Sequence, residues 1–320
     1  MNKPGQQAHP PLNTKARLVF HLEMALVYLA VSVFSIVGCS VTSIRVPNLF
    51  AMVLVCVVLI IIVMPLALWY NEKGKFDLCD AAFTIPWAIA LLMLLPFPLA
   101  VVARLSMHRE LQDAQLTRID QYLNAGVPSI IAWASSHRVL SFASECYRLS
   151  LLPFLVAYLL PALMGRAKSA QRFVRVNVVA FVVGIALFAW FPAIGPWYGY
   201  HFAPTAMQAD CQAGVFAVRL PGIYILHLFG IVCFPSFHVI WAVLGANSLW
   251  EFRFLRVPAI IASGLVLYST MTTGWHYFSD VIGGVAVAAV AILVVKALNR
   301  FHCRFELGQV CSESGKDSEV

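Results

Sequence analysis

The sequence predicts an all-α, polytopic membrane protein, built as a helical bundle with about eight transmembrane helices. Three observations lead to this prediction. Apolar residues make up 61% of the 320 residues and charged residues only 12%, about half the charged share of a soluble domain. The mean hydropathy is +0.81. The apolar residues are grouped into runs of about 20, the length that a helix needs to cross a bilayer.

Eight runs satisfy this length to different degrees. The second is the clearest, because it carries no charge, and the sixth is weakened by a polar entry that contains proline. The runs lie at roughly 20–42, 49–70, 81–103, 147–165, 174–194, 235–252, 256–274 and 279–298. Such a composition excludes a soluble enzyme and a secreted disulfide scaffold.

Basic residues predict how the chain is oriented. The formal net charge is +7, and Lys and Arg are enriched in the cytoplasmic loops of membrane proteins. With the N-terminus in the cytoplasm, 15 of the 22 basic residues lie inside and 7 outside. Eight spans then place both termini in the cytoplasm, in a bacterial inner or plasma membrane. No basic run is interleaved with aromatic residues, so nucleic acid is not an expected partner.

Four segments follow from this topology. We expect an N-terminal cytoplasmic segment with three peripheral transmembrane helices over 1–104, an extracytoplasmic interfacial helical segment over 105–146, a C-terminal transmembrane bundle over 147–300, and a cytoplasmic tail over 301–320 that is disordered from 305. In the second segment, apolar side chains gather on one helix face, at Leu111, Leu116, Ile119 and Leu123. That pattern suits a helix lying on the membrane, and a simple surface helix is the alternative.

A segment rich in aromatic residues, Gly and Pro covers 195–221. Trp and Tyr prefer the headgroup level of a bilayer, so an aromatic belt would explain it. A lid over a lipid site is the second interpretation, and the sequence does not decide between the two.

Asp280 is the one formal charge between Arg256 and Lys296. An ionisable residue in a membrane span indicates function by default, and its partner is His276, four residues earlier. On a helix these positions share a face, so the carboxylate can accept the imidazole N–H and fix the tautomer. A structural hydrogen bond and half of a metal site are the alternatives.

A second histidine strengthens the catalytic interpretation. His238 lies 38 residues before His276, and half of that separation is about 28 Å of helix, one bilayer crossing. A helical hairpin would therefore return both imidazoles to the same membrane face, which the charge count makes the outer one. The turn before His238 also suits an anion, because Pro235 and Ser236 open a helix whose N–H groups attract negative charge. One histidine could attack phosphorus while the other protonates the leaving oxygen.

These residues resemble a known family. Phe234-Pro235-Ser236-Phe237-His238 and Ser269-x6-His276-Tyr277-x2-Asp280 are similar to the second and third signature motifs of the type 2 phosphatidic acid phosphatase superfamily. That superfamily contains integral-membrane lipid phosphatases and phosphotransferases and shares a core with vanadium haloperoxidases. The resemblance implies a C-terminal catalytic bundle in which His276, Asp280 and His238 carry the reaction.

The departures point to a divergent branch. The first motif, Lys-x6-Arg-Pro, is absent, Phe237 stands where glycine is usual, and Thr270 stands where the third motif has arginine. These losses resemble the branch of inositolphosphorylceramide and sphingomyelin synthases, and they remove cations that would hold phosphate. Ser236, Phe237, Arg219 and Thr270 are therefore the phosphate-binding candidates, with further outer-side alternatives at Arg104, Arg109, Arg148 and His201.

The resemblance implies an integral-membrane, metal-independent lipid phosphotransferase or phosphatase that works through a phosphohistidine without a cofactor. Its partners would be a lipid phosphoester and either a lipid or polyol acceptor, as in inositolphosphotransferases, or water. The eight cysteines fall singly, without metal spacing, and none is expected to bind a metal. A simple lipid phosphate or pyrophosphate phosphatase, a proton-coupled transporter and a scaffold with an inactive site are the alternatives.

Overall fold

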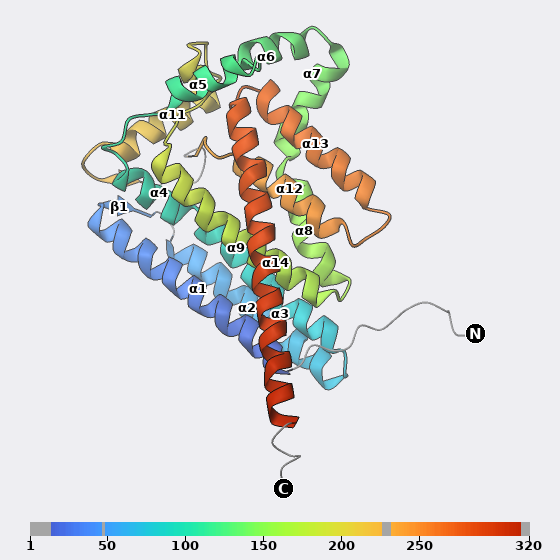
Figure 1. The fold of residues 1–320 in the computed structure, drawn as a ribbon. Coiled ribbons are helices and arrows are strands. Elements are labelled where there is room, and N and C mark those ends of the chain that lie inside the picture. Colours follow the sequence, from blue (N-terminus) through green and yellow to red (C-terminus); the bar gives the residue numbers. More distant parts are fainter. Residues whose placement is uncertain (1–13, 47–48, 226–231, 315–320) are drawn as a thin grey trace.

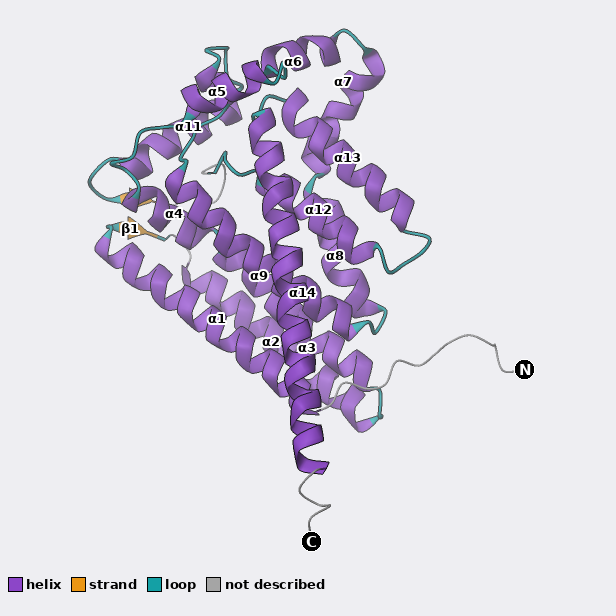
Figure 2. Cartoon of the chain, in the orientation of Figure 1, coloured by secondary structure: helices purple, strands orange, loops and turns teal. Residues whose placement is uncertain are grey.

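Helices form most of the structure (Figures 1 and 2). The computed structural model describes residues 14–46, 49–225 and 232–314, and within them lie fourteen α-helices, one 3-10 helix and one two-stranded sheet. The prediction of a mostly helical bundle is confirmed. The sheet was not foreseen: β1 (Ile44–Arg45) pairs in parallel with β2 (Tyr224–Ile225).

The N-terminal part contains four helices, α1 (Thr14–Val41), α2 (Leu49–Glu72), α3 (Phe76–Leu94) and α4 (Pro96–Leu105). The apolar run predicted as one span over 81–103 is divided between α3 and α4. The division falls at Pro96, which lacks an N–H and is favoured in the first turn of a helix, whereas Pro86 lies inside α3. Residues 1–13 of the predicted cytoplasmic segment lie outside the described residues.

Short helices form a cap at one end of the bundle, shown at the top of Figure 1. They include α5 (Asp113–Tyr122), α6 (Val127–Ser135) and α11 (Ala206–Arg219), with α7 (Arg138–Ser144) descending from α6. The 3-10 helix η1 (Glu145–Leu149) leads from α7 into α8 (Leu151–Leu163). The helix α10 (Pro196–Gly199) follows the long α9 (Ala167–Trp190) and contacts α5.

The C-terminal part is a helical hairpin, α12 (Phe237–Leu249) and α13 (Arg256–Thr272), followed by α14 (Phe278–Ser314). The last helix starts near the cap and runs to the opposite end, where α1 begins (Figure 1). It remains helical as far as Ser314, so the expectation of a disordered tail from 305 is wrong for the described part. Good helix formers such as Leu, Glu and Arg continue through that stretch; residues 315–320 lie outside the described residues.

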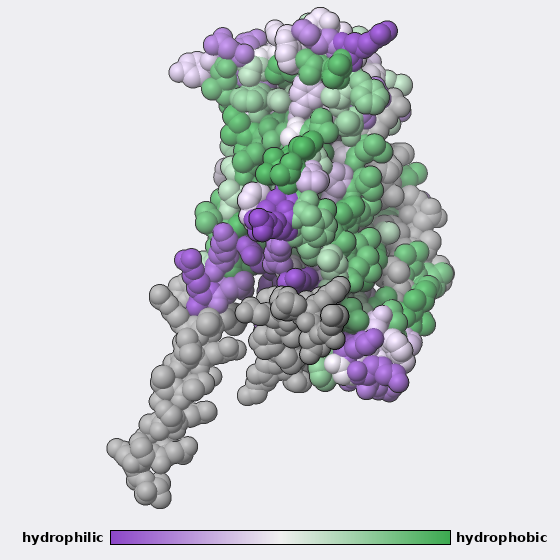
Figure 3. All heavy atoms as spheres, turned by 90° about the vertical axis from the view of Figure 1, so that its right-hand side faces the viewer, coloured by the Kyte–Doolittle hydropathy of each residue, from purple (hydrophilic) through white to green (hydrophobic). Residues whose placement is uncertain are grey.

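Three helices of the described chain are long and apolar enough to cross a membrane, at Val19–Val41, Ala167–Trp190 and Phe278–Arg300. A fourth span is possible if Arg138–Tyr147 and Leu151–Leu163, which meet at a bend of 55°, act together. Figure 3 shows a broad apolar surface below a polar rim. Eight transmembrane helices are not confirmed, in part because α12 has 13 residues, about 20 Å of helix against the roughly 30 Å of a bilayer core.

The core lies where α8, α9, α12 and α14 meet. The rings of Phe154 and Phe181 pack against Trp241 and Phe237 of α12, whereas α14 contributes small side chains, among them Ala288 and Ala291, both fully buried. Small residues let helices approach closely. At Gly284 the approach leaves no room at all, since an added Cβ would lie 2.8 Å from the carbonyl oxygen of Ser236 and 2.9 Å from Val239.

We therefore predict that Gly284→Ala destabilises the protein by about 1–3 kcal/mol, the usual cost of overpacking. The added methyl group would push the start of α14 away from the start of α12. The matched control is Gly264→Ala in α13, where an added Cβ meets nothing within 4 Å and better helix propensity stabilises by up to about 1 kcal/mol. Thermal unfolding in detergent measures both, and an equal effect of the two substitutions would contradict the packing argument.

Candidate active site

The hairpin brings two histidines together at the capped end of the bundle. The ring centroids of His238, in the first turn of α12, and His276, just before α14, lie 5.8 Å apart with 60° between the ring planes. His276 is buried and His238 is half-buried. The predicted meeting of the two imidazoles is therefore found in the structure.

His276 and Asp280 are in contact, but not along one helix face as predicted. The Nδ1 atom of His276 lies 3.3 Å from Oδ2 of Asp280, yet His276 precedes the helix that begins at Phe278. A turn at Gly274, with φ of +72°, delivers the imidazole to the helix start. The N–H of Tyr277 also donates to Oδ2 of Asp280 at 2.9 Å, which closes the turn between the two residues.

Two oxygen acceptors fix the tautomer of His276. Besides Asp280, the carbonyl oxygen of Cys233 lies 3.1 Å from Nδ1. Because both partners only accept, the hydrogen resides on Nδ1, and Nε2 keeps its lone pair. Burial lowers the pKa of His276 to about 4, against a smaller opposing effect of the Cys233 carbonyl. The free site therefore contains a neutral imidazole with an available nitrogen nucleophile.

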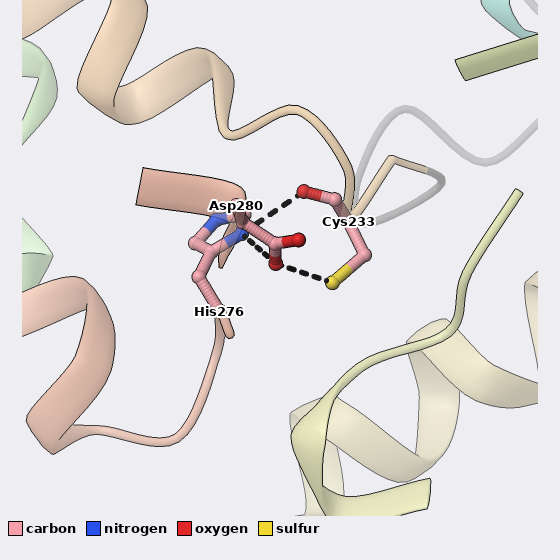
Figure 4. A group of neighbouring side chains, drawn as sticks. All are labelled: Cys233, His276 and Asp280. Carbon is pink, nitrogen blue, oxygen red and sulfur yellow. Dashed lines mark hydrogen bonds and ion pairs between the residues drawn. The ribbon is translucent and has the colours of Figure 1, made fainter. Parts of the chain in front are cut away.

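Cys233 is a member of this network that the sequence interpretation missed. Its thiol donates to Oδ2 of Asp280 at 2.9 Å (Figure 4), and it is 3% exposed. A single cysteine in an apolar span looks like a small hydrophobic residue; its place just before the Phe-Pro-Ser turn was the available signal. Potential ligand atoms of Cys233, His276 and Asp280 lie within 4.8 Å of one another. A thiophilic cation such as Zn²⁺ accepts this donor set, but here the thiol of Cys233 and the imidazole of His276 both lie within hydrogen-bond distance of Oδ2 of Asp280.

The start of α12 provides main-chain donors beside the histidines. The hydroxyl of Ser236 caps the helix by accepting the N–H of Val239 at 3.4 Å, and the N–H of Ser236 donates to the carbonyl oxygen of Asp280 at 3.3 Å. Phe237 and His238 occupy the first helical positions, where N–H groups have no partner within the helix. The ring of Phe237 points into the bundle, against Phe181 and Trp241, so its bulk leaves these N–H groups clear.

The structure places the other two phosphate-binding candidates in structural contacts. The guanidinium of Arg219 donates to the carbonyl oxygens of Met107, at 3.1 Å, and Arg109. The hydroxyl of Thr270 donates to the carbonyl oxygen of Leu267 at 2.8 Å. The carbonyl of Thr270 accepts the N–H of His276 at 3.2 Å, so Thr270 supports the histidine through its main chain.

The alternative cations also have other neighbours. Arg104 is buried and donates to a carbonyl oxygen in the loop between α11 and β2 at 3.1 Å. The guanidinium of Arg109 lies 4.3 Å from the centre of the Trp190 ring. His201 is exposed, and the side chain of Arg148 lies outside the described part.

Aromatic rings that the sequence did not assign to the site surround the histidines. The ring of Tyr147 lies 5.0 Å from that of His238 and 5.9 Å from that of Trp275. Trp197 packs against Trp275 at 5.6 Å and is 3% exposed. The beginning of the aromatic segment 195–221 thus packs beside the site and does not form a belt at that point.

The helix α5 adds two buried carboxylates. Asp113 accepts the N–H groups of Ile194 and Gly195 and lies 3.0 Å from the hydroxyl of Tyr277. Asp120 accepts the N–H groups at the start of α14. The inward face of α5 therefore carries Asp113, Leu116, Thr117 and Asp120, while Ile119 and Leu123 of the predicted apolar face are 46% and 43% exposed.

Burial raises the pKa of both carboxyl groups of α5, and the N–H donors oppose this effect. Only donors contact the carboxylate oxygens of Asp113 and Asp120. A protonated carboxyl group would place its own hydrogen against them. The geometry therefore fits the ionised form of both side chains.

Two neighbouring imidazoles, one oriented by a buried carboxylate, define a site suited to nucleophilic phosphoryl transfer in a helical membrane protein. The chain belongs to the PAP2 superfamily, whose family model matches residues 114–294, more than half of the sequence, including both histidines and Asp280. No curated protein and no solved structure matches the chain significantly. Membership supports a phosphatase or phosphotransferase acting on lipid phosphoesters.

We predict that Cys233→Ala destabilises the protein by about 1.5–3 kcal/mol, the range for a hydrogen bond to a charged group. Cys233→Ser, which keeps a donor, should lose clearly less. Cys211→Ala is the control for truncating a buried cysteine that has no hydrogen bond among the described residues. Thermal unfolding of the three variants measures the difference, and equal losses for the alanine and serine variants at Cys233 would show that the thiol does not support Asp280.

Proposed function

We propose that this protein is a membrane phosphotransferase that moves a phosphorylated lipid head group through a phosphohistidine at His276. The observation that carries the proposal is the fixed imidazole of His276. Its Nδ1 atom is held by the carbonyl of Cys233 and the carboxylate of Asp280, and the centre of the His238 ring lies 5.8 Å from the centre of the His276 ring.

The reaction needs two steps. Nε2 of His276 attacks phosphorus, the bond from phosphorus to the leaving oxygen breaks, and His238 donates a proton to that oxygen. Asp280 stabilises the positive charge that develops on the imidazole. In the second step an acceptor hydroxyl attacks the phosphohistidine while His238 takes its proton, and His276 is regenerated.

The phosphate is proposed to bind at the start of α12. The free N–H groups of Phe237 and His238 and the dipole of α12 would hold its oxygens, and Ser236 keeps this turn in shape. Arg219 and Thr270 would have to leave their present acceptors to contribute side-chain donors.

Charge favours a phosphodiester as the donor lipid. Asp113, Asp120 and Asp280 are all buried, and within the described residues none forms an ion pair with Lys or Arg. Uncompensated carboxylates repel a doubly charged phosphate monoester more than a singly charged diester. A diester donor retains a head group, so this supports head-group transfer to a lipid or polyol over plain phosphate removal. Hydrolysis remains the alternative, with water as the acceptor.

The topology is proposed from the charge distribution. The beginning of α1 and the end of α14 lie at the end of the bundle opposite the cap (Figure 1), which is consistent with cytoplasmic termini and an extracytoplasmic site. In this arrangement α5 to α7 lie at the outer membrane surface. Exposed aromatic side chains there, including Tyr122 and Trp133, suit the headgroup level.

A panel of fluorescent phosphodiester and phosphomonoester lipids tests the function. Purified protein in nanodiscs is incubated with each donor and with lipid or polyol acceptors, and products are separated. Transfer from a diester supports the proposal, and release of inorganic phosphate from monoesters alone would overturn it in favour of a phosphatase. Vanadate, which mimics pentacoordinate phosphorus, should inhibit and should raise the unfolding temperature; no effect of vanadate and no product would contradict phosphoryl transfer altogether.

Asp280→Asn is expected to keep the fold and lower kcat by about 10⁴-fold, the size of the same change in the serine protease triad. The amide preserves the shape but removes the charge that stabilises an imidazolium. Asp210→Asn, an exposed position on α11, is the control. Unchanged turnover in Asp280→Asn would show that this carboxylate is structural.

The two histidines should respond differently to the leaving group. A nitrophenyl phosphodiester needs little protonation on departure, so His238→Ala should be partly rescued by it. His276→Ala should not be rescued, because a missing nucleophile is not replaced by a better leaving group. His137→Ala, at an exposed position, is the control. Rescue of His276→Ala alone would reverse the assigned roles, and equal losses with both substrates would refute the assignment.

A further inference from the structure

Asp120 lies on α5, outside the residues assigned to the reaction, and is fully buried. Both of its carboxylate oxygens accept hydrogen bonds. Oδ2 receives the N–H of Phe278 at 2.8 Å and Oδ1 receives the N–H of Ser279 at 2.9 Å. These two N–H groups belong to the first turn of α14, between His276 and Asp280 in the chain.

The segment between His276 and Asp280 is therefore held in place by hydrogen bonds to α5. Besides the two bonds from Asp120, the hydroxyl of Tyr277 lies 3.0 Å from Asp113 and 2.9 Å from the carbonyl oxygen of Gly195. Tyr277 is completely buried, and a Cβ at Gly199 would lie 2.1 Å from its hydroxyl oxygen. The segment between His276 and Asp280 is tightly packed, so a displacement of α5 would displace this segment as well.

Asp120 also decides which helix start can receive an anion. The starts of α12 and α14 lie side by side, since Gly284 contacts the carbonyl of Ser236. The carboxylate of Asp120 accepts the N–H groups of α14 and neutralises the positive end of its dipole, whereas those of Phe237 and His238 have no hydrogen-bond partner in the described part of the chain. A phosphate is thereby directed to α12, with His276 beside it.

We propose that Asp120 is a positioning residue, which holds the first turn of α14 so that Asp280 keeps His276 aligned and the phosphate binds at α12. The inference rests on the proposed function. Turnover by the wild-type protein, measured first with the lipid panel, separates a failure of that function from a failure of this inference.

A double-mutant cycle tests the role. Asp120→Asn should lower kcat for the nitrophenyl phosphodiester by about 10- to 100-fold, since a misplacement of about 1 Å costs this much, with KM changed less than about twofold. In the Asp280→Asn background the same substitution should cost less than about threefold, because a residue that acts through the oriented imidazole has little left to position. Equal losses in both backgrounds would overturn the proposal.

Two further variants keep the test decisive. Thr84→Val removes a buried hydroxyl of α3 far from the site in the chain. It should lower the unfolding temperature without changing kcat, which separates general destabilisation from positioning. Asp120→Glu keeps the charge and should recover part of the kcat lost in Asp120→Asn; it replaces the asparagine variant in the cycle if that variant does not fold. No recovery by Asp120→Glu together with equal losses in both backgrounds would leave Asp120 a purely structural residue.

Discussion

The site depends on one carboxylate oxygen, Oδ2 of Asp280. It accepts the N–H of Tyr277 and the thiol hydrogen of Cys233, and it lies 3.3 Å from Nδ1 of His276. Burying a carboxylate costs free energy unless hydrogen-bond donors contact it. The donors to this oxygen come from two separate segments of the chain, which are thereby held next to each other. The loop before α12 and the turn before α14 are joined at this atom. The carboxylate of Asp280 therefore both joins the two ends of the hairpin and orients His276.

The N-termini of α12 and α14 meet at the site, and the N–H groups of their first turns differ in their hydrogen-bond partners. The N–H groups of Phe278 and Ser279 at the start of α14 donate to Asp120, while those at the first positions of α12 have no hydrogen-bond partner among the described residues. Helix starts are natural anion sites, and two open ones would offer a phosphate two binding modes. With one of them filled, a bound phosphate lies beside the imidazole that can attack it. In the proposed mode of binding, occupation of the α14 N-terminus by Asp120 would thus contribute to the placement of the phosphate.

The sequence predicted the features that depend on spacing. The 38 residues between His238 and His276 predicted the hairpin, and the four-residue step to Asp280 predicted the contact, although His276 sits in a turn and not in the helix. Contacts between residues that are far apart in the sequence are not indicated by any spacing of this kind. The role of Cys233 depends on a partner 47 residues away, and that of Asp120 on one 159 residues away. The inward-facing acids of α5 were not indicated by spacing either, because Asp113 and Asp120 accept N–H groups of segments far away in the chain. The predicted number of spans is not confirmed, since the apolar run over 81–103 is divided between α3 and α4 and the helices Arg138–Tyr147 and Leu151–Leu163 meet at a bend of 55°.

Charge balance suggests how such a site could accept an anion without the lysine and arginine of the absent first motif. The free site contains buried carboxylates and a neutral His276, whose pKa is lowered to about 4 by burial. In the proposed reaction, a phosphate entering at the start of α12 adds negative charge close to His238 and favours the protonated form of that imidazole. In this proposed mechanism, binding of the anion would be accompanied by uptake of a proton, and that proton would serve the departure of the leaving group. In the motif that this chain lacks, lysine and arginine supply a permanent positive charge that balances the phosphate. Here a proton taken up by a histidine would supply that positive charge instead. A singly charged diester requires one such proton, which a single histidine can carry, whereas a doubly charged monoester would require more positive charge than the imidazole of His238 alone supplies.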